Sequence, residues 1–168
     1  MPAGTYKLTA QAFQRPGDIT GSYNNYVGGN ENISTKLYLN TDMQPVKHIV
    51  SEAEDAKLHD DDATVGEPAV YFPNTMASAA AYFANGKYNN EVSSTLTNEG
   101  NLTIGIKCDH SEGAYWSIFD NFKLYYYGSP ELQLDETATV APTINNTFDK
   151  VTLKRTIKPN TWSTFVVP

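Results

Sequence analysis

The sequence predicts a mainly β protein with one short helix, and three observations lead to this prediction. The run from Tyr115 to Gly128 is the longest with the composition of a strand. A shorter run, Leu102 to Cys108, alternates at period two between apolar and other residues. The signals that begin and end a helix are strongest around a single segment, residues 74–86.

Composition excludes several classes of partner. The chain has 12 basic and 19 acidic residues, a net charge of −7 and no cluster of Lys or Arg, so nucleic acid and anionic membranes are not expected to bind. No apolar run approaches the ~18 residues of a membrane span. Charged residues make up only 18% and aromatic residues 12%, a balance typical of extracellular β proteins that work through polar and stacking contacts.

Cysteine content and the N-terminal residues say little about the compartment. A single cysteine excludes an internal disulfide framework, which suits the cytoplasm and also suits bacterial extracellular proteins with large β cores. No charged leader or long apolar stretch follows Met1, so no secretion signal is expected in this sequence.

The first half of the chain begins with a predicted strand and a long loop. Residues 5–12 alternate apolar and polar side chains at period two and predict a strand. Residues 14–34 are rich in Gly, Asn and Ser and predict a loop that carries Tyr23 and Tyr26. Residues 36–40 predict a short strand whose two leucines point inward.

The middle of the chain is less regular. Residues 46–53 have helical spacing before an acidic run, and residues 70–72 predict a brief strand. The predicted helix has Asn74 or Thr75 as N-cap, Gly86 at C′, and an apolar face formed by Met76, Ala80 and Phe83. Residues 87–100 predict a polar loop or an edge strand.

The two apolar runs after residue 100 are predicted to form a hairpin, with the second run as the central strand of a sheet. Period two places five residues of that run on one side: Trp116, Ile118, Phe122, Leu124 and Tyr126. Asp120 has the parity of this apolar side. Its carboxylate must therefore be hydrogen-bonded, paired with a cation, or turned outward by a bulge.

Three parts are predicted along the chain: a β domain at 1–128, a linker at 129–147, and a β-hairpin at 148–168. The linker has little apolar periodicity. The hairpin is too short to enclose a core, so it either packs on the first domain or opens a second sandwich.

Residues 2–128 resemble the galactose-binding-like jelly-roll modules of large surface and secreted proteins of gut bacteria. The most specific parts are G-x-L-x-I-G-I-K at Gly100–Lys107 and W-x-I-F-D-N-F-x-L-x-Y-x-G at Trp116–Gly128. The tail is similar to the first hairpin of a β-sandwich that often follows such modules. These modules usually carry further strands ahead of the A-G-T-Y turn, so the first domain is expected to be N-terminally truncated.

The resemblance implies an antiparallel two-sheet β-sandwich of jelly-roll, galactose-binding-like type, a secreted or cell-surface location, and no catalysis. It also implies carbohydrate binding by loops at one end of the sandwich. Such modules often hold a structural calcium ion, for which Asp120 is the candidate ligand. The competing interpretation of Asp120 is a buried carboxylate that accepts backbone N–H bonds at a bulge.

A sugar site needs flat aromatic faces and amide or carboxylate groups on loops. The residues that offer this chemistry are Tyr23, Asn24, Tyr26, Tyr88, Asn89, Asp109 and Tyr115. For any one of them, the competing interpretation is an ordinary residue of a β-protein loop. Cys108 has the parity of its apolar neighbours and is predicted to be a small buried hydrophobe.

The sequence therefore predicts a non-catalytic carbohydrate-binding module, an accessory part of a larger protein, with glycans and neighbouring domains as partners and no required cofactor. The alternative is a structural or adhesive spacer that contacts protein partners through its sheet edges. No motif nominates a pair of carboxylates for glycoside hydrolysis.

Overall fold

The computed structural model describes residues 1–128, 131–135, 137 and 150–156. The protein is mainly β, with 44% of the described residues in strands and 16% in helices. The strands are β1 (Gly4–Arg15), β2 (Thr35–Leu39), β3 (Asp42–Pro45), β4 (Lys47–His48), β5 (Ala63–Val65), β6 (Val70–Phe72), β7 (Asn89–Leu96), β8 (Ile104–Cys108), β9 (Trp116–Tyr126), β10 (Glu131–Asp135) and β11 (Lys150–Lys154). The helices are α1 (Ile19–Val27), the 3-10 helix η1 (Ile49–Glu52) and α2 (Met76–Ala84).

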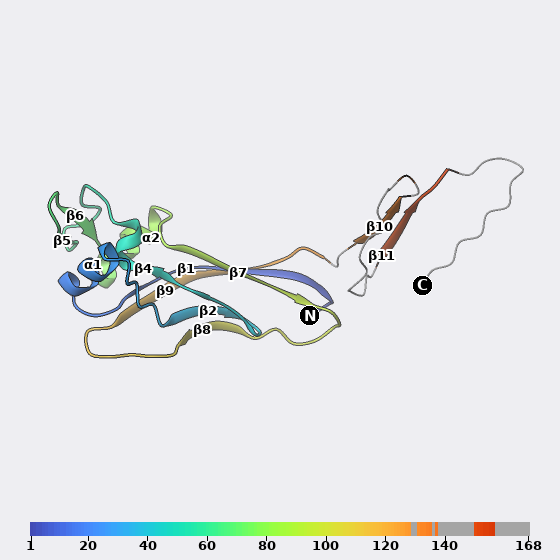
Figure 1. Cartoon of the computed structure of the whole chain (residues 1–168), viewed down its shortest axis with the longest axis horizontal. Helices are drawn as coiled ribbons and strands as arrows, with labels where there is room; N and C mark the ends of the chain where they lie inside the picture. The colour runs from blue at the N-terminus through green and yellow to red at the C-terminus, as the bar shows by residue number, and fades with distance from the viewer. Residues whose placement is uncertain (129–130, 136, 138–149, 157–168) are drawn as a thin grey trace, which may run out of the picture.

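Two sheets form the main body (Figure 1). In the larger sheet, β1 is central and pairs antiparallel with β9 along one edge and with β7 along the other, where β4 adds a short parallel pairing. The smaller sheet has the antiparallel order β3-β2-β8. A separate two-stranded pair, β5-β6, lies near the helices.

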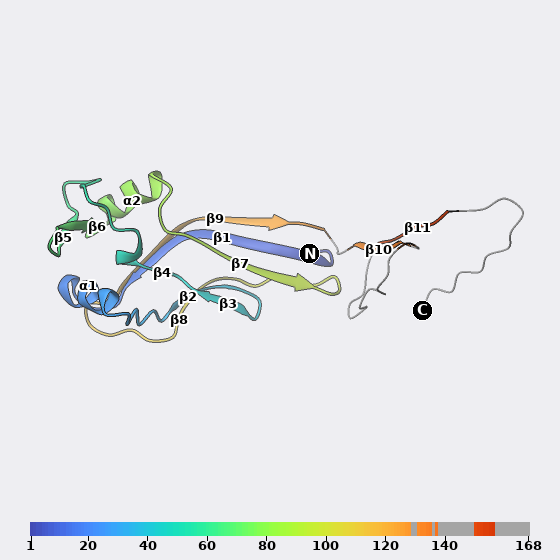
Figure 2. The ribbon, with the colours of Figure 1, turned by 45° about the horizontal axis from the view of Figure 1, so that its top comes forward.

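The two sheets lie face to face, as Figure 2 shows, and one apolar cluster fills the space between them. The side chains of β1 that point toward the smaller sheet, on what we call the inner face of the larger sheet, are buried. Both leucines of β2 are buried as well, as predicted. The members of this cluster are Tyr6, Leu8, Ala10, Ala12, Leu37, Leu39, Val46 and Val92. The structure is therefore sandwich-like.

A second cluster lies on the opposite face of β1, at the end that carries the helices. Its buried aromatic side chains come from β1, β6, α2 and the residue just before β7: Phe13, Phe72, Tyr82, Phe83 and Tyr88. Together the helices and these rings cover one end of the larger sheet on its outer face.

Helix α2 confirms the predicted caps but not the predicted buried face. The Thr75 side chain accepts a hydrogen bond from Ser78 N, and Gly86, at φ +74°, follows the C-cap residue Asn85. Burial falls on Ser78, Ala79, Tyr82 and Phe83, whereas Met76 and Ala80 are exposed.

Helix α1 was not predicted, because its segment has the composition of a loop. The Asp18 carboxylate caps the helix by accepting a bond from Gly21 N at 2.7 Å. Glycine and asparagine are weak helix formers, so the cap and packing against the second cluster stabilise α1. The described residues therefore contain two α-helices, whereas the sequence predicted one.

Strands β8 and β9 do not form the predicted hairpin. β8 pairs with β2 and β9 pairs with β1, so the loop between them crosses from one sheet to the other. β9 is also an edge strand rather than a central one, since β1 is its only partner among the described residues.

A bulge in β9 reverses the predicted parity. The pairing with β1 shifts between Gln11↔Asp120 and Thr9↔Lys123, and Asn121 has φ +56°. Before the bulge, Ile118 pairs with Phe13 on the outer face; after it, Leu124 pairs with Leu8 on the inner face. The five residues predicted on one side are thus divided between two faces.

The C-terminal part contains β10 and β11, which pair in parallel and lie beyond the end of the main body farthest from the helices (Figure 1). β10 falls within the predicted linker, where no strand was expected. The second half of the predicted hairpin, at 157–168, lies outside the described residues. No helix in the described part of the chain is long and apolar enough to cross a membrane.

Candidate functional site

Helix α1 carries three of the predicted sugar-binding residues. Tyr23 and Tyr26 are half-buried against the second cluster, and the Tyr26 ring stacks on His48 with a centroid distance of 4.9 Å. Tyr23 packs on the β5-β6 turn, where a Cβ at Gly66 would lie 2.5 Å from its hydroxyl oxygen. Asn24 is exposed. The two tyrosines therefore hold α1 on the body of the protein.

Tyr88 lies in the core, so its ring offers no surface to a ligand. Its side chain is 0% exposed, its hydroxyl donates to Ile49 O at 2.6 Å, and its ring lies 4.7 Å from that of Phe13. Burial raises the pKa of the Tyr88 hydroxyl well above its usual value. The neighbouring Asn89 is exposed and donates from Nδ2 to Gly86 O.

The loop between β8 and β9 carries Asp109 and Tyr115. Asp109 forms ion pairs with Lys107 at 2.8 Å and Lys36 at 2.7 Å, and their hydrogen bonds lower the pKa of its carboxyl to about 2. The half-buried Tyr115 meets the His110 ring edge to face, with centroids 5.8 Å apart.

Cys108 is exposed rather than buried, so the prediction from its parity is wrong. It keeps the inner-face register opposite Thr35 but is the last residue of β8, which among the described strands pairs only with β2. Its Sγ donates to His110 O at 3.0 Å, and a hydrogen bond with Thr35 is the largest of the effects that lower its pKa.

The seven predicted ligand residues thus come from three places: α1, the segment after α2, and the β8-β9 loop. No hydrogen bond or ring contact joins one group to another within the described ranges. Tyr23, Tyr26 and Tyr88 share the second cluster as packing residues, and in the described residues no such contact joins Asp109 or Tyr115 to them.

Asp120 lies at the β9 bulge and is exposed, so the predicted bulge is present but the carboxylate is not buried. Its Oδ1 accepts from Asn121 N at 2.7 Å, and Asn121 Nδ2 donates to Gln11 Oε1 at 2.6 Å. In the described part of the chain, no group of three or more His, Cys, Asp or Glu is placed to hold a metal ion. The calcium hypothesis therefore gains no support.

A shallow groove of about 270 Å³ lies between α2 and the first half of β9. Its walls are mostly apolar, and the exposed face of α2 forms one of them. The lining residues are Met76, Ala79, Ala80, Phe83, Ala84, Ile118, Phe119, Asp120 and Asn121.

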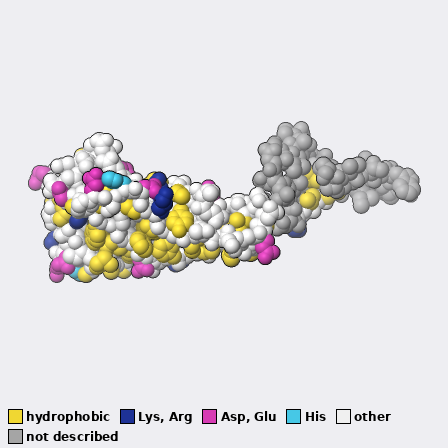
Figure 3. Space-filling view, turned by 90° about the horizontal axis from the view of Figure 1, so that it is seen from below, with side chains coloured by type: hydrophobic (Ala, Val, Ile, Leu, Met, Phe, Trp, Pro, Cys, Tyr) yellow, Lys and Arg dark blue, Asp and Glu magenta, His cyan; other side chains and the backbone are white. Residues whose placement is uncertain are grey.

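An apolar surface lies beside this groove, where inner-face side chains of β9 and β8 are exposed. Figure 3 shows hydrophobic side chains exposed along the body when it is seen from below. We call this surface the open flank. Its members are Ile104 (41% exposed), Phe119 (50%), Phe122 (39%), Leu124 (38%) and Tyr126 (48%).

The open flank exists because the sandwich is closed along only one side. On the side of β7, strand β3 of the smaller sheet lies against the larger sheet. On the other side, β8 pairs only with β2 and β9 only with β1 in the described residues. Backbone N–H and C=O groups along the free edge of β9 therefore have no strand partner there.

The sequence did not predict the open flank, because apolar alternation marks a face without showing what covers it. The one available signal was Asp120 followed by Asn121 within an apolar strand, which indicated the bulge.

Comparison of the chain with protein-family models, with curated proteins and with solved structures found no match.

Proposed function

We propose that this chain is a non-catalytic structural module that joins to another β-structured polypeptide by strand addition at the free edge of β9. The observation that carries this proposal is the open flank, which combines an unpaired strand edge with a row of exposed apolar side chains. Contiguous apolar surface at a strand edge is typical of a contact site between proteins.

Strand addition would satisfy both features at once. The backbone groups of the incoming strand would continue the ladder of the larger sheet, and its alternate side chains would cover the apolar row. Soluble proteins usually protect a long edge strand with bulges, charges or a covering element. β9 has one bulge and two charges along its 11 residues, and within the described ranges no element covers the inner face of its second half.

The fold type and the location of the protein are also part of this proposal. We infer a jelly-roll sandwich of galactose-binding-like type, working in a secreted or cell-surface protein. Two mainly antiparallel sheets packed face to face support the sandwich. The jelly-roll type, the secreted location and the absence of catalysis are proposed from the resemblance in the sequence.

A labelled peptide that copies residues 115–127 tests strand addition. We expect the peptide to bind with increased fluorescence anisotropy and to protect β9 amides from hydrogen exchange, because it supplies the missing strand. A peptide of the same composition in scrambled order is the control.

Two protein variants complete this test. Leu124→Lys places a charge in the open flank and should abolish peptide binding, whereas Val27→Lys, at another exposed apolar position on α1, should leave it unchanged. Equal binding of both peptides, or of both variants, would refute strand addition at β9.

Carbohydrate binding is the second candidate, and one observation favours it. Tyr115 shares the β8-β9 loop with His110 and with Asp109, which holds two lysines. An aromatic ring beside charged donors and acceptors on an exposed loop suits the apolar face and hydroxyls of a pyranose.

Affinity electrophoresis in gels that contain plant or host glycans tests this candidate. Retention by one glycan that is lost in Tyr115→Ala, but kept in Tyr127→Ala, would support it. Tyr127 is a matched control because it is an exposed tyrosine outside the loop. Equal mobility of all three proteins in every gel would eliminate the loop as a sugar site.

A further inference from the structure

We propose that the strand added to β9 is β9 of a second copy of this chain, paired antiparallel across a two-fold axis that passes between Asn121 and Phe122. This inference rests on the proposed function and names its partner. Three independent features of β9 carry it: the parity switch, the placement of its two charges, and the groove beside it.

The bulge exchanges the faces on which odd-numbered and even-numbered residues of β9 lie. A two-fold pair of β9 strands can therefore keep inner-face residues opposite inner-face residues along its whole length. In such a pair, every residue before the bulge lies opposite a residue after the bulge on the other copy. Phe119 would lie opposite Leu124, and Ser117 opposite Tyr126, and all four belong to the inner face by their pairing with β1. Without the bulge, the same register would place inner-face residues opposite outer-face residues.

The charges on β9 complement each other in this register. Asp120 and Lys123 both lie on the outer face, paired with Gln11 and Thr9 of β1. Both are exposed, and neither has an ion-pair partner within the described ranges. The two-fold register places Asp120 of each copy opposite Lys123 of the other, which forms two cross-strand ion pairs.

Neighbouring registers lack this complementarity. Moving the axis by one residue along the strand places Asp120 opposite either Asn121 or Tyr125, and Lys123 opposite either Ile118 or Phe122. Neither alternative pairs opposite charges. The charge pattern therefore selects a single register among those that the bulge permits.

The groove between α2 and β9 adds an apolar contact. Ile118 lines this groove, and in the two-fold register its cross-strand neighbour is Tyr125 of the second copy, also an outer-face residue. Tyr125 is 43% exposed in the single chain. Pairing would bring its ring beside the apolar wall that α2 forms, next to Met76 and Ala80.

Sedimentation equilibrium of five proteins tests the inference. The wild type should dimerise, and Asp120→Lys and Lys123→Asp should each raise the dissociation constant about tenfold, because each turns two attractive pairs into two repulsive ones. The double variant Asp120→Lys/Lys123→Asp should restore the wild-type constant. Glu91→Lys on β7 changes the net charge as much as Asp120→Lys does and should have no effect.

The outcomes separate this inference from the function on which it rests. If the β9 peptide binds but the chain stays monomeric, the second copy is not the partner, and strand addition stands. A dimer that loses stability in both single variants but is not rescued in the double variant contradicts the register. If neither peptide nor second copy binds, both proposals fail.

Discussion

The two halves of β9 have similar composition and opposite environments. Ile118, before the bulge, is 7% exposed because the second cluster and α2 cover the outer face there. Leu124, after the bulge, is 38% exposed although it pairs with the fully buried Leu8. The bulge places the two residues on opposite faces of the sheet, and among the described residues only the outer face at Ile118 is covered.

This comparison shows that period-two alternation identifies the face of a residue but not its burial. Burial requires a second layer over that face, and the second layer comes from segments far away in the sequence. Among the described residues the smaller sheet ends at β8, so no described strand covers the apolar inner face of the second half of β9.

The largest expected effect on stability comes from shortening the covered side chain of Ile118. Ile118→Ala should lower the free energy of unfolding by about 3 to 4 kcal/mol, because it leaves a cavity in a packed cluster. Leu124→Ala should cost less than about 1 kcal/mol at low protein concentration, because its side chain is already partly hydrated. Urea unfolding of both variants measures this difference. Equal losses would show that the two halves are equally buried.

The stability of the protein should also depend on pH through His48, which lies at the end that carries the helices. His48 is fully buried, its Nδ1 accepts from Val50 N at 3.1 Å, and its Nε2 has no hydrogen-bond partner in the described structure. Burial lowers the pKa of the His48 imidazole from 6.5 to about 4.

Because its folded pKa is lower, the unfolded chain binds the proton more readily between about pH 4 and pH 6.5. The contribution of neutral His48 to the free energy of unfolding is therefore complete above pH 6.5. It is lost as the pH falls toward 4, which lowers the free energy of unfolding by about 2 to 3 kcal/mol. His48→Asn keeps an acceptor in the side chain and should flatten this part of the profile of unfolding free energy against pH. An unchanged slope in the variant would exclude His48 as its source.

The bulge that separates the two halves should have a smaller effect. Asn121→Ala should destabilise the protein by about 1 to 2 kcal/mol, because alanine tolerates φ +56° poorly and the bond to Gln11 is lost. Asn121→Gly removes the same bond but suits the backbone, so it should cost less. Thermal unfolding of the two variants measures the order, and a more stable alanine variant would contradict this account of the bulge.

Much of the fold could be predicted from local signals. The alternation in residues 5–12, the short strand at Leu37 and Leu39, and the caps of α2 depend on neighbouring residues alone, and the structure confirms them. The bulge at Asp120 was also open to prediction, since a carboxylate on an apolar face requires a local explanation.

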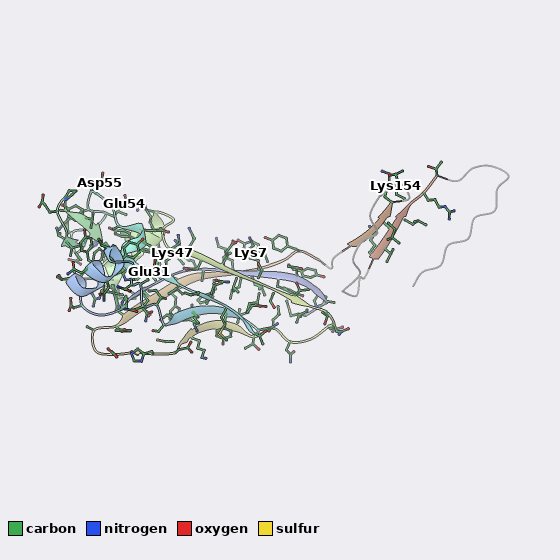
Figure 4. All side chains as sticks on the ribbon, in the orientation of Figure 1. Lys7, Glu31, Lys47, Glu54, Asp55 and Lys154 are labelled. Carbon is green, nitrogen blue, oxygen red and sulfur yellow. The ribbon has the colours of Figure 1, made fainter. Side chains whose placement is uncertain are left out.

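The remaining features depend on long-range packing. The core position of Tyr88 follows from rings supplied by β1 and α2, and sequence spacing does not reveal these neighbours. Helix α1 depends on one cap and on packing against the second cluster. On the outer face, Lys7 of β1, labelled in Figure 4, forms an ion pair with Glu91 of β7, and the register of the two strands sets this contact. The open flank depends on where the smaller sheet ends.

The central claim is that the free edge of β9 receives a strand from another molecule. Hydrogen exchange of the wild type, measured from low to high micromolar concentration, tests it most directly, with the other edge strand, β7, as internal reference. The account predicts that protection of residues 121–126 increases with concentration while protection of β7 stays constant. Exchange in β9 that is the same at every concentration would contradict it.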